Sequence, residues 1–228
     1  MPRPIGGYRL KDGTRVPGVT TYTSFLTGDP GGLMHWAWDL GIQGKDYRKE
    51  RDKAAGVGTI VHAMIDNDLM GHASTTDNIP TADGLEVSKD VYADMLAKAD
   101  VGYKAYLGWK AGVSLEITSA EVAMVSEEFR FGGTPDATAR LNGEFVFLDW
   151  KTSNSIHPQY IAQVAAYDQL WYENNGERAT SGMLLRVGKD EGDFHVHSWP
   201  RHVLDMGWRA FLHCKELYEL NKHLKKVC

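Results

Sequence analysis

Two carboxylates and a lysine are brought together by a hairpin that can be recognised in the sequence. Asn142-Gly143 is the strongest short-range signal for a two-residue type I′ turn, because both central positions of that turn need a positive φ. If the turn closes there, counting outward along both strands places Asp136 directly opposite Asp149. Facing like charges are destabilising. A shared divalent cation is the simplest reason for keeping two of them in this position.

Lys151 adds a positive charge to the same face of the second strand. Side chains alternate with period two along a strand, so Asp149 and Lys151 point the same way. Taken alone, an Asp-x-Lys pattern is usually a surface ion pair near a strand end. The facing Asp136 and the helix that follows favour a compact hydrolytic site instead.

That helix is expected to begin near Pro158, a residue that is well tolerated in the first helical turn. Gln163 and Tyr167 stack on it at i,i+4 spacing. Trp171 continues the same stripe, and we interpret it as a packing residue. Gln163 is a polar amide on this stripe, and it therefore becomes a site candidate.

The residues named so far, with one segment upstream, resemble the PD-(D/E)XK nuclease superfamily, specifically its RecB-like exonuclease branch. The similarity covers positions 56 to 172. It is carried by four short motifs in the right order, which are Gly58-Thr59-Ile60-Val61-His62, Gly133-Thr134-Pro135-Asp136, Asp149-Trp150-Lys151 and Gln163-x-x-x-Tyr167.

The resemblance implies an α/β fold with a restriction-endonuclease-like core, in which helices flank a mixed central β-sheet, and a helical N-terminal region. We expect one domain over residues 1–228. Within it we expect an N-terminal helical and hairpin region (1–55), a nuclease core (56–199) and a C-terminal helix (200–228).

The resemblance also implies catalytic roles for five residues, which are Asp136, Asp149, Lys151, Gln163 and Tyr167. Metal ligands would be Asp136, Asp149, the backbone carbonyl of Trp150, His62 and Glu121. Oxygen ligands suit Mg²⁺ or Mn²⁺, and an imidazole favours Mn²⁺. A lone helical His is usually structural, but His62 matches the metal-ligating His of the family. Glu121 is equally well explained as a charged residue at a strand end.

The resemblance implies a metal-dependent DNA exonuclease, a phosphodiester hydrolase of phage or bacterial recombination and repair. Its expected partners are DNA and a single-strand annealing or recombination protein. A structure-selective endonuclease would use the same site. A non-catalytic nucleic-acid-binding module would keep the fold without the site, and intact Asp136, Asp149 and Lys151 count against it. A structural Ca²⁺ site in an unrelated β-rich protein would not need Lys151 or Gln163. Cleavage polarity and strand preference stay open.

Composition sets few further limits. A chain of 228 residues with 43% hydrophobic and 24% charged residues is ordinary for a globular protein. The net charge of −5 gives no global basic field, although Lys and Arg can still gather along one groove. Two cysteines, Cys214 and Cys228, are too few for a disulfide framework or an iron–sulfur cluster. We expect no membrane span or signal peptide and a cytoplasmic location, in the host cytoplasm if the protein is phage-encoded.

The remaining chain is expected to be mainly helical, with two aromatic or basic segments of interest. The aromatic residues of segment 31–41 could stack with bases, but buried packing is favoured. Segment 45–53 is interpreted first as a solvated helix face and second as a phosphate patch.

We expect Gly56-x-Gly58 to break a helix, Thr59 to cap the next one, 71–84 to be a loop and 120–125 to be a strand. A hairpin at 8–16, helices at 20–26, 86–110 and 203–224 and strands at 115–117, 181–187 and 193–199 complete the prediction.

Overall fold

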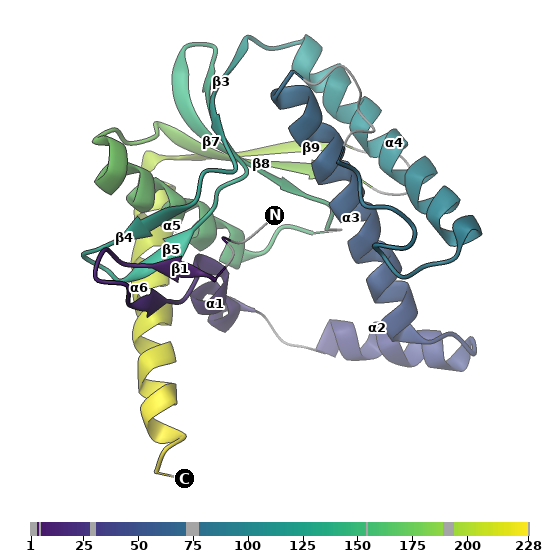
Figure 1. Cartoon of the computed structure of the whole chain (residues 1–228), viewed down its shortest axis with the longest axis horizontal. Helices are drawn as coiled ribbons and strands as arrows, with labels where there is room; N and C mark the ends of the chain where they lie inside the picture. The colour runs from purple at the N-terminus through teal and green to yellow at the C-terminus, as the bar shows by residue number, and fades with distance from the viewer. Residues whose placement is uncertain are drawn as a thin grey trace.

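The structure is a computed structural model, and it describes residues 4, 6–27, 31–71, 78–153, 155–188 and 194–227. At its centre lies a five-stranded mixed sheet with strand order β3-β6-β7-β8-β9 (Figure 1). Only the pairing between β7 and β8 is parallel. The strands span Leu115–Ala120 (β3), Ala137–Leu141 (β6), Glu144–Lys151 (β7), Ser181–Val187 (β8) and Phe194–Pro200 (β9).

The hairpin of β6 and β7 has the predicted register. Leu141 pairs with Glu144 and Ala137 pairs with Leu148, so Asp136 and Asp149 are the residues next to the last pair of the ladder, one on each side of the hairpin. The turn residues Asn142 and Gly143 have φ of 50° and 89°, the positive values that a type I′ turn requires.

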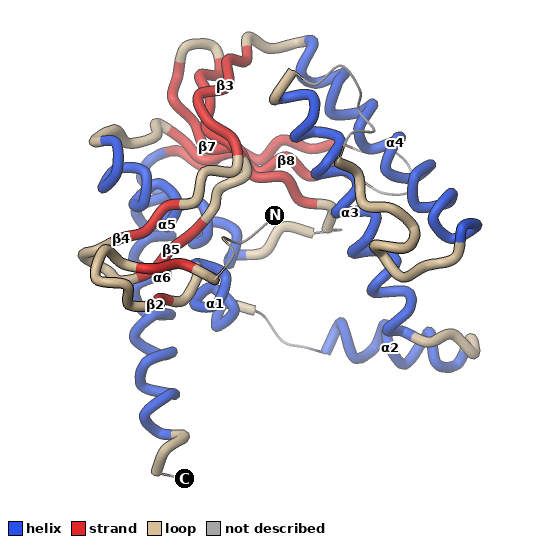
Figure 2. Tube along the Cα trace, in the orientation of Figure 1, coloured by secondary structure: helices blue, strands red, loops and turns tan. Residues whose placement is uncertain are grey.

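Helices cover both faces of the sheet (Figures 1 and 2). Val146, Leu148 and Trp150 pack in a core with α3 (Tyr47–Leu69) and α4 (Lys89–Ala111). Phe145 and Phe147, on the other face of β7, pack with α5 (Pro158–Asn175) and α6 (Arg201–Leu224). Burying each of these large side chains stabilises the fold by roughly 1.5–3 kcal/mol. Side chains alternate between the two faces along β7, so Asp149 and Lys151 share the face of Phe145 and Phe147 and point toward α5.

The predicted mixed α/β sheet with flanking helices and the helical N-terminal region are confirmed. Smaller elements complete the fold, which are β1 (Tyr8–Arg9), β2 (Arg15–Val16), α1 (Val19–Thr23), the 3-10 helix η1 (Ser24–Leu26), α2 (Gly31–Ile42), β4 (Met124–Ser126) and β5 (Phe131–Gly133). Among the described residues, no helix combines the length and the apolar character needed to cross a membrane.

Three local predictions at element ends are wrong. The helix α3 runs unbroken through Gly56 and Gly58, and Thr59 does not cap a helix but donates from its hydroxyl to the carbonyl of Ala55 at 3.1 Å. A boundary at 55/56 therefore falls inside α3. The helix expected at 20–26 begins earlier, because α1 starts at Val19 with Gly18 as its N-cap. The expected strand 120–125 is interrupted at Glu121, whose φ of 51° ends β3 before β4 begins.

The predicted burial of the aromatic residues in segment 31–41 is also wrong. These residues form α2 as expected, but Trp38 is 63% exposed and Trp36 is 37% exposed. Only Leu40 of this helix is buried. Of the predicted loop 71–84, residues 72–77 lie outside the described residues, as do Asp193 of the predicted strand 193–199 and Cys228.

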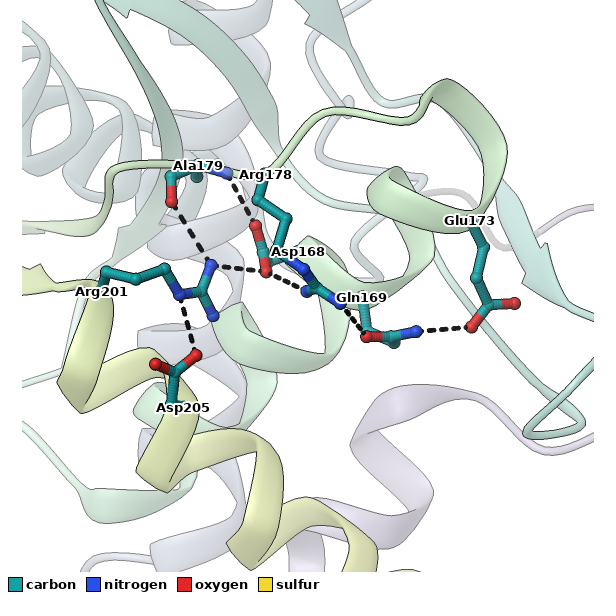
Figure 3. A network of polar contacts seen from close by, with 7 residues as sticks. All are labelled: Asp168, Gln169, Glu173, Arg178, Ala179, Arg201 and Asp205. Atoms are coloured by element: carbon teal, nitrogen blue, oxygen red, sulfur yellow. Dashed lines mark hydrogen bonds and ion pairs between the residues drawn. The ribbon is translucent and has the colours of Figure 1, made fainter.

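A buried carboxylate joins α5, the segment between α5 and β8, and α6 (Figure 3). Asp168 is fully buried and accepts hydrogen bonds from the backbone N–H of Ala179 at 2.8 Å, from Arg178 at 2.8 Å and from Arg201 at 2.7 Å. Arg201 also pairs at 2.9 Å with Asp205, which is 62% exposed. The same guanidinium thus bonds one buried and one exposed carboxylate.

We expect Asp168→Ala to lower the free energy of unfolding by about 2–4 kcal/mol. The substitution removes the carboxylate shared by two partly buried guanidinium groups and leaves the buried N–H of Ala179 without its acceptor. Asp205→Ala, the matched control on the same arginine, should cost at most about 1 kcal/mol because its ion pair is exposed. Urea denaturation of both variants measures the difference. Equal losses of unfolding free energy would contradict the claim that Asp168 holds these elements together.

Candidate active site

The two facing carboxylates are both buried at the end of the central hairpin. Asp136 and Asp149 are each 1% exposed. Asp136 Oδ2 accepts a hydrogen bond from the backbone N–H of Trp150 at 2.9 Å. Removal from water raises the pKa of both carboxyls, and that of Asp149 reaches about 6. Keeping two ionised carboxylates buried at this position therefore lowers the stability of the fold.

Lys151 is an ion-pair partner within this site rather than a surface residue. Its Nζ lies 2.5 Å from Asp149 Oδ2 and 5.4 Å from the ring centroid of Tyr160, and its side chain is 17% exposed. Burial lowers the pKa of Lys151, but the charges of Asp149 and Asp136 outweigh burial and raise it. The raised pKa favours the ammonium form of Lys151 beside Asp149, and this form suits stabilisation of negative charge.

The helix α5 presents its polar pair to Asp149 as the i,i+4 spacing predicts. Gln163 Nε2 donates to Asp149 Oδ1 at 3.2 Å and to Tyr167 Oη at 3.0 Å. Burial, followed by the charges of Asp149 and Asp136, raises the pKa of Tyr167 well above its usual value, so the phenol stays neutral. Trp171 packs against Phe145 with ring centroids 5.5 Å apart, as expected of a packing residue.

Glycine at position 133 makes room for the α5 side chains. A Cβ on Gly133 would lie 2.7 Å from Tyr167 Cε1 and 2.9 Å from Leu170 Cδ1. The neighbouring Thr134 hydroxyl bonds Tyr8 Oη at 3.0 Å. Sequence reasoning missed Tyr8 and Tyr160 as neighbours of the site, because neither belongs to a short motif.

His62 reaches the same site from α3, at the C-terminal end of β7. This approach depends on Gly58, where a Cβ would lie only 2.6 Å from Thr152 Oγ1. Burial and then the charge of Lys151 lower the pKa of His62 to about 4, against the opposing effects of Asp149 and a hydrogen bond with the Trp150 backbone. The imidazole is therefore neutral at physiological pH, the form that binds metal ions.

A second acidic pair lies beside His62. Asp66 and Glu121 line, with His62, a cavity of about 340 Å³. Burial, then the charges of Glu121 and Asp136, raise the pKa of Asp66 to about 7. The backbone N–H of Glu121 donates to the Asp136 carbonyl at 3.0 Å. The i+4 spacing of Asp66 from His62 is the sequence signal that could have placed Asp66 in the site.

The donors fit a hard cation, although they are not yet gathered around one. Asp136 Oδ1 is buried without a hydrogen-bond partner among the described residues. The described residues contain no set of three or more acidic, His or Cys side chains already spaced to hold a metal ion. Asp149 Oδ2 is engaged by Lys151 instead. The set supplies carboxylate oxygens and a neutral imidazole, which are ligands of Mg²⁺ and Mn²⁺.

Comparisons with known proteins give distant structural similarities only. No family model matches the chain, and no curated protein matches it. A candidate exonuclease from Eubacterium rectale aligns with a TM-score of 0.41 and 15% identity over 68% of this chain and 63% of that protein, which is less than two thirds of its length. The alkaline exonuclease LHK-Exo from Laribacter hongkongensis aligns with a TM-score of 0.32 and 14% identity over 73% of this chain and 93% of its own. At these identities and TM-scores the similarities carry no argument about what this chain does.

Proposed function

We propose that this chain is a metal-dependent DNA nuclease of the PD-(D/E)XK superfamily that hydrolyses phosphodiester bonds. One observation carries the proposal: the Lys151 amine contacts Asp149 Oδ2, and Asp136 is buried next to the same end of the β6–β7 ladder. Burying two carboxylates and an ammonium costs several kcal/mol per ion before pairing. A site that retains such groups next to a cavity is a candidate for chemistry.

Asp136, Asp149, His62 and the carbonyl of Trp150 would hold Mg²⁺ or Mn²⁺, with Glu121 and Asp66 beside them. Such an ion, when bound, makes water more acidic and neutralises charge on the scissile phosphate. The metal ion would compete with Lys151 for Asp149 Oδ2, so the Asp149–Lys151 ion pair is expected to lengthen when the metal binds. The free Oδ1 of Asp136 would gain the partner that it lacks.

The side chains around the carboxylates would have separate roles in catalysis. Lys151, as a cation, would stabilise the negative charge that develops on the phosphoryl oxygens and orient the attacking water. Gln163 is bonded to both Asp149 and Tyr167, and it would hold the nucleophile or the phosphate in line. Tyr167, a neutral phenol, would act as a hydrogen-bond donor to the phosphate.

Within this class we favour the RecB-like exonuclease branch, acting on DNA ends in phage or bacterial recombination and repair. An annealing or recombination protein would then be the natural partner for the single strand produced. The short motifs around His62 and Gln163 support this branch. Intact Asp136, Asp149 and Lys151 count against a non-catalytic module, and a structural Ca²⁺ site would not need Lys151 or Gln163. A structure-selective endonuclease remains the second candidate because it would use the same residues.

The test compares end-labelled linear DNA with covalently closed circles, single- and double-stranded, in Mg²⁺ or Mn²⁺. We expect linear DNA to be degraded from its ends while circles survive. Ca²⁺ should support binding more than turnover, because it is a larger and weaker Lewis acid. Nicking or linearisation of circles would move the assignment to the endonuclease. Binding without any cleavage would leave only a nucleic-acid-binding module.

A further inference from the structure

A cavity of about 370 Å³ lies between the β1–β2 hairpin, the start of α1 and the last turns of α6. The side chains of Arg15 and Lys222 line this cavity, together with Thr21 and the rings of Tyr8 and Tyr218. None of the described Asp and Glu residues lines it. A concave surface whose charged groups are all cations concentrates anions. The composition of this cavity therefore favours an anionic ligand.

Arg15 faces a second arginine across the β1–β2 hairpin. Arg9 and Arg15 are cross-strand partners, and like charges in this relation are destabilising. Arg9 Nη1 donates to the Gly13 carbonyl at 2.9 Å, whereas Arg15 lies against Gly7, where a Cβ would be 2.9 Å from Arg15 Nε. Arg15 has no ion-pair partner among the described residues. An anion in the cavity would supply the opposite charge that this guanidinium lacks.

Lys222, the second cation, is only weakly engaged within the protein. Its Nζ lies 4.0 Å from Glu219 Oε2, and the two side chains are 59% and 42% exposed. An ion pair of this length and exposure contributes little to stability. Lys222 is therefore able to bind an external anion at small cost.

The chain around the cavity is basic as a whole. Segments 6–27 and 218–227 hold six Lys or Arg residues and two Asp or Glu residues, in a protein whose net charge is −5. Segment 127–130, which contacts the hairpin where Glu127 Oε1 accepts the backbone N–H of Lys11 at 2.9 Å, adds two acidic residues and one basic residue. The local charge stays positive with this segment included.

The cavity is joined directly to the strand that leads to Asp136. The Pro17 carbonyl accepts the backbone N–H of Gly132 at 3.0 Å, and Tyr8 Oη bonds Thr134 Oγ1 at 3.0 Å. Gly132 precedes Asp136 by four residues, which span at most about 14 Å. Each strand of a DNA duplex advances about 3.4 Å per nucleotide. A phosphate in the cavity would thus lie roughly five nucleotides or fewer from a phosphate at the carboxylates.

We propose that this cavity binds a non-scissile phosphate of the DNA substrate, held by Arg15 and Lys222 with the Thr21 hydroxyl as a further donor. Arginine suits this role because its planar guanidinium can donate two parallel hydrogen bonds to a phosphate. The phosphate is either at a chain end or within the backbone, and both present the same anionic oxygens. The proposal rests on the nuclease function. It names residues that position the strand beside the carboxylates and take no part in the chemistry.

The first test measures binding of fluorescein-labelled DNA 20-mers, single- and double-stranded, by anisotropy. Ca²⁺ and the Lys151→Ala background keep the DNA intact. Arg15→Ala should weaken binding of the preferred form about tenfold, as expected for the loss of a charge-assisted contact, and Arg15→Lys should lose less. Arg209→Ala is the matched control, because Arg209 is an exposed arginine of α6 outside the cavity. This control should bind DNA as the background protein does.

Steady-state cleavage in Mn²⁺ distinguishes positioning from chemistry. A phosphate contact that is equally strong in the ground state and the transition state lowers KM without changing kcat. Arg15→Ala in the otherwise wild-type protein should therefore raise KM about tenfold and leave kcat within a few fold.

Salt dependence tests whether both cations bind one phosphate. Each phosphate contact contributes about 0.9 to the slope of log K against log salt for a duplex and about 0.7 for a single strand. The double variant of Arg15→Ala and Lys222→Ala should reduce the slope by the value for one contact, because the two side chains share their ligand.

Neutral groups in the DNA locate the phosphate. A methylphosphonate replaces one backbone phosphate at a time, and 20-mers with and without terminal phosphates cover the chain ends. At one position the background protein should lose about tenfold in affinity, and the double variant should lose nothing further there. A loss at a terminal phosphate assigns the cavity to a chain end, and a loss at an internal one assigns it to the backbone.

Four results would overturn the phosphate site. These are absent DNA binding by the background protein, unchanged affinity in Arg15→Ala, an equal loss in Arg209→Ala, or no phosphate whose neutralisation affects only the protein with the intact cavity. Failure of the nuclease proposal is distinct, because it would appear as absent cleavage by the wild-type protein in Mn²⁺ whatever the anisotropy gives.

Discussion

Lys151→Ala is expected to reduce the rate of DNA cleavage by about 10²–10⁴-fold while leaving DNA affinity nearly unchanged. The protonated amine has no lone pair for a metal ion, so its removal should not cost a ligand. Its charge acts on the phosphate as negative charge develops, and its loss should therefore appear in kcat rather than in KM. Single-turnover cleavage of end-labelled linear DNA in Mn²⁺, together with equilibrium DNA binding in Ca²⁺, separates the two effects.

Tyr160→Phe provides the control for Lys151. It keeps the ring that faces the Lys151 amine at 5.4 Å and removes only the hydroxyl. Cleavage by this variant should stay within a few fold of wild type. If Lys151→Ala cleaves DNA near the wild-type rate, the Asp149–Lys151 contact is only an ion pair and the proposed chemistry fails.

Asp149→Asn is expected to abolish cleavage and to change stability in opposite directions with and without metal. Burial, opposed by Lys151 and assisted by Asp136, raises the pKa of Asp149 from its usual 3.8 to about 6. The folded protein therefore loses stability as pH rises through about 6, when this buried group must ionise. The neutral amide avoids that loss. Without metal, the variant should unfold at a higher temperature than wild type at pH 8, and at the same temperature below about pH 4.

The size of this gain follows from the pKa shift. Each pKa unit corresponds to about 1.4 kcal/mol, which gives an upper limit of about 3 kcal/mol and a shift of several degrees in Tm. The loss of the contact with Lys151 reduces the gain. Thermal unfolding at pH 4 and pH 8 measures it.

Metal should reverse the order of the two proteins. Mn²⁺ should raise the Tm of wild type and not that of Asp149→Asn, because a ligand that binds only the folded state stabilises it. Asp205→Asn, which changes an exposed carboxylate in the second turn of α6, is the matched control and should respond to Mn²⁺ as wild type does. Equal stabilisation of Asp149→Asn and wild type by Mn²⁺ would remove Asp149 from the metal site.

The sequence by itself determined the features governed by local rules. The Asn142-Gly143 turn fixes the register of β6 and β7, and the period of two then sets Asp136 against Asp149 and puts Lys151 on the same face. The 3.6-residue period likewise brings Gln163 to Tyr167 on α5. These relations need only neighbouring residues, because turn geometry and strand pairing transmit them along a single hairpin or helix.

Tertiary structure alone decided which residues are buried and how closely segments approach. The local sequence around Gly58 predicts a helix break, yet Gly58 lies inside α3. A residue without a side chain is needed there because α3 passes close to Thr152. The sequence predicts that Trp38 is buried, yet no segment of the described chain covers its side chain. The charge of Lys151 and the neutrality of His62 depend on carboxylates and burial contributed by distant strands. Such properties are set by the solvent and charge around a side chain, and residues remote in sequence supply both.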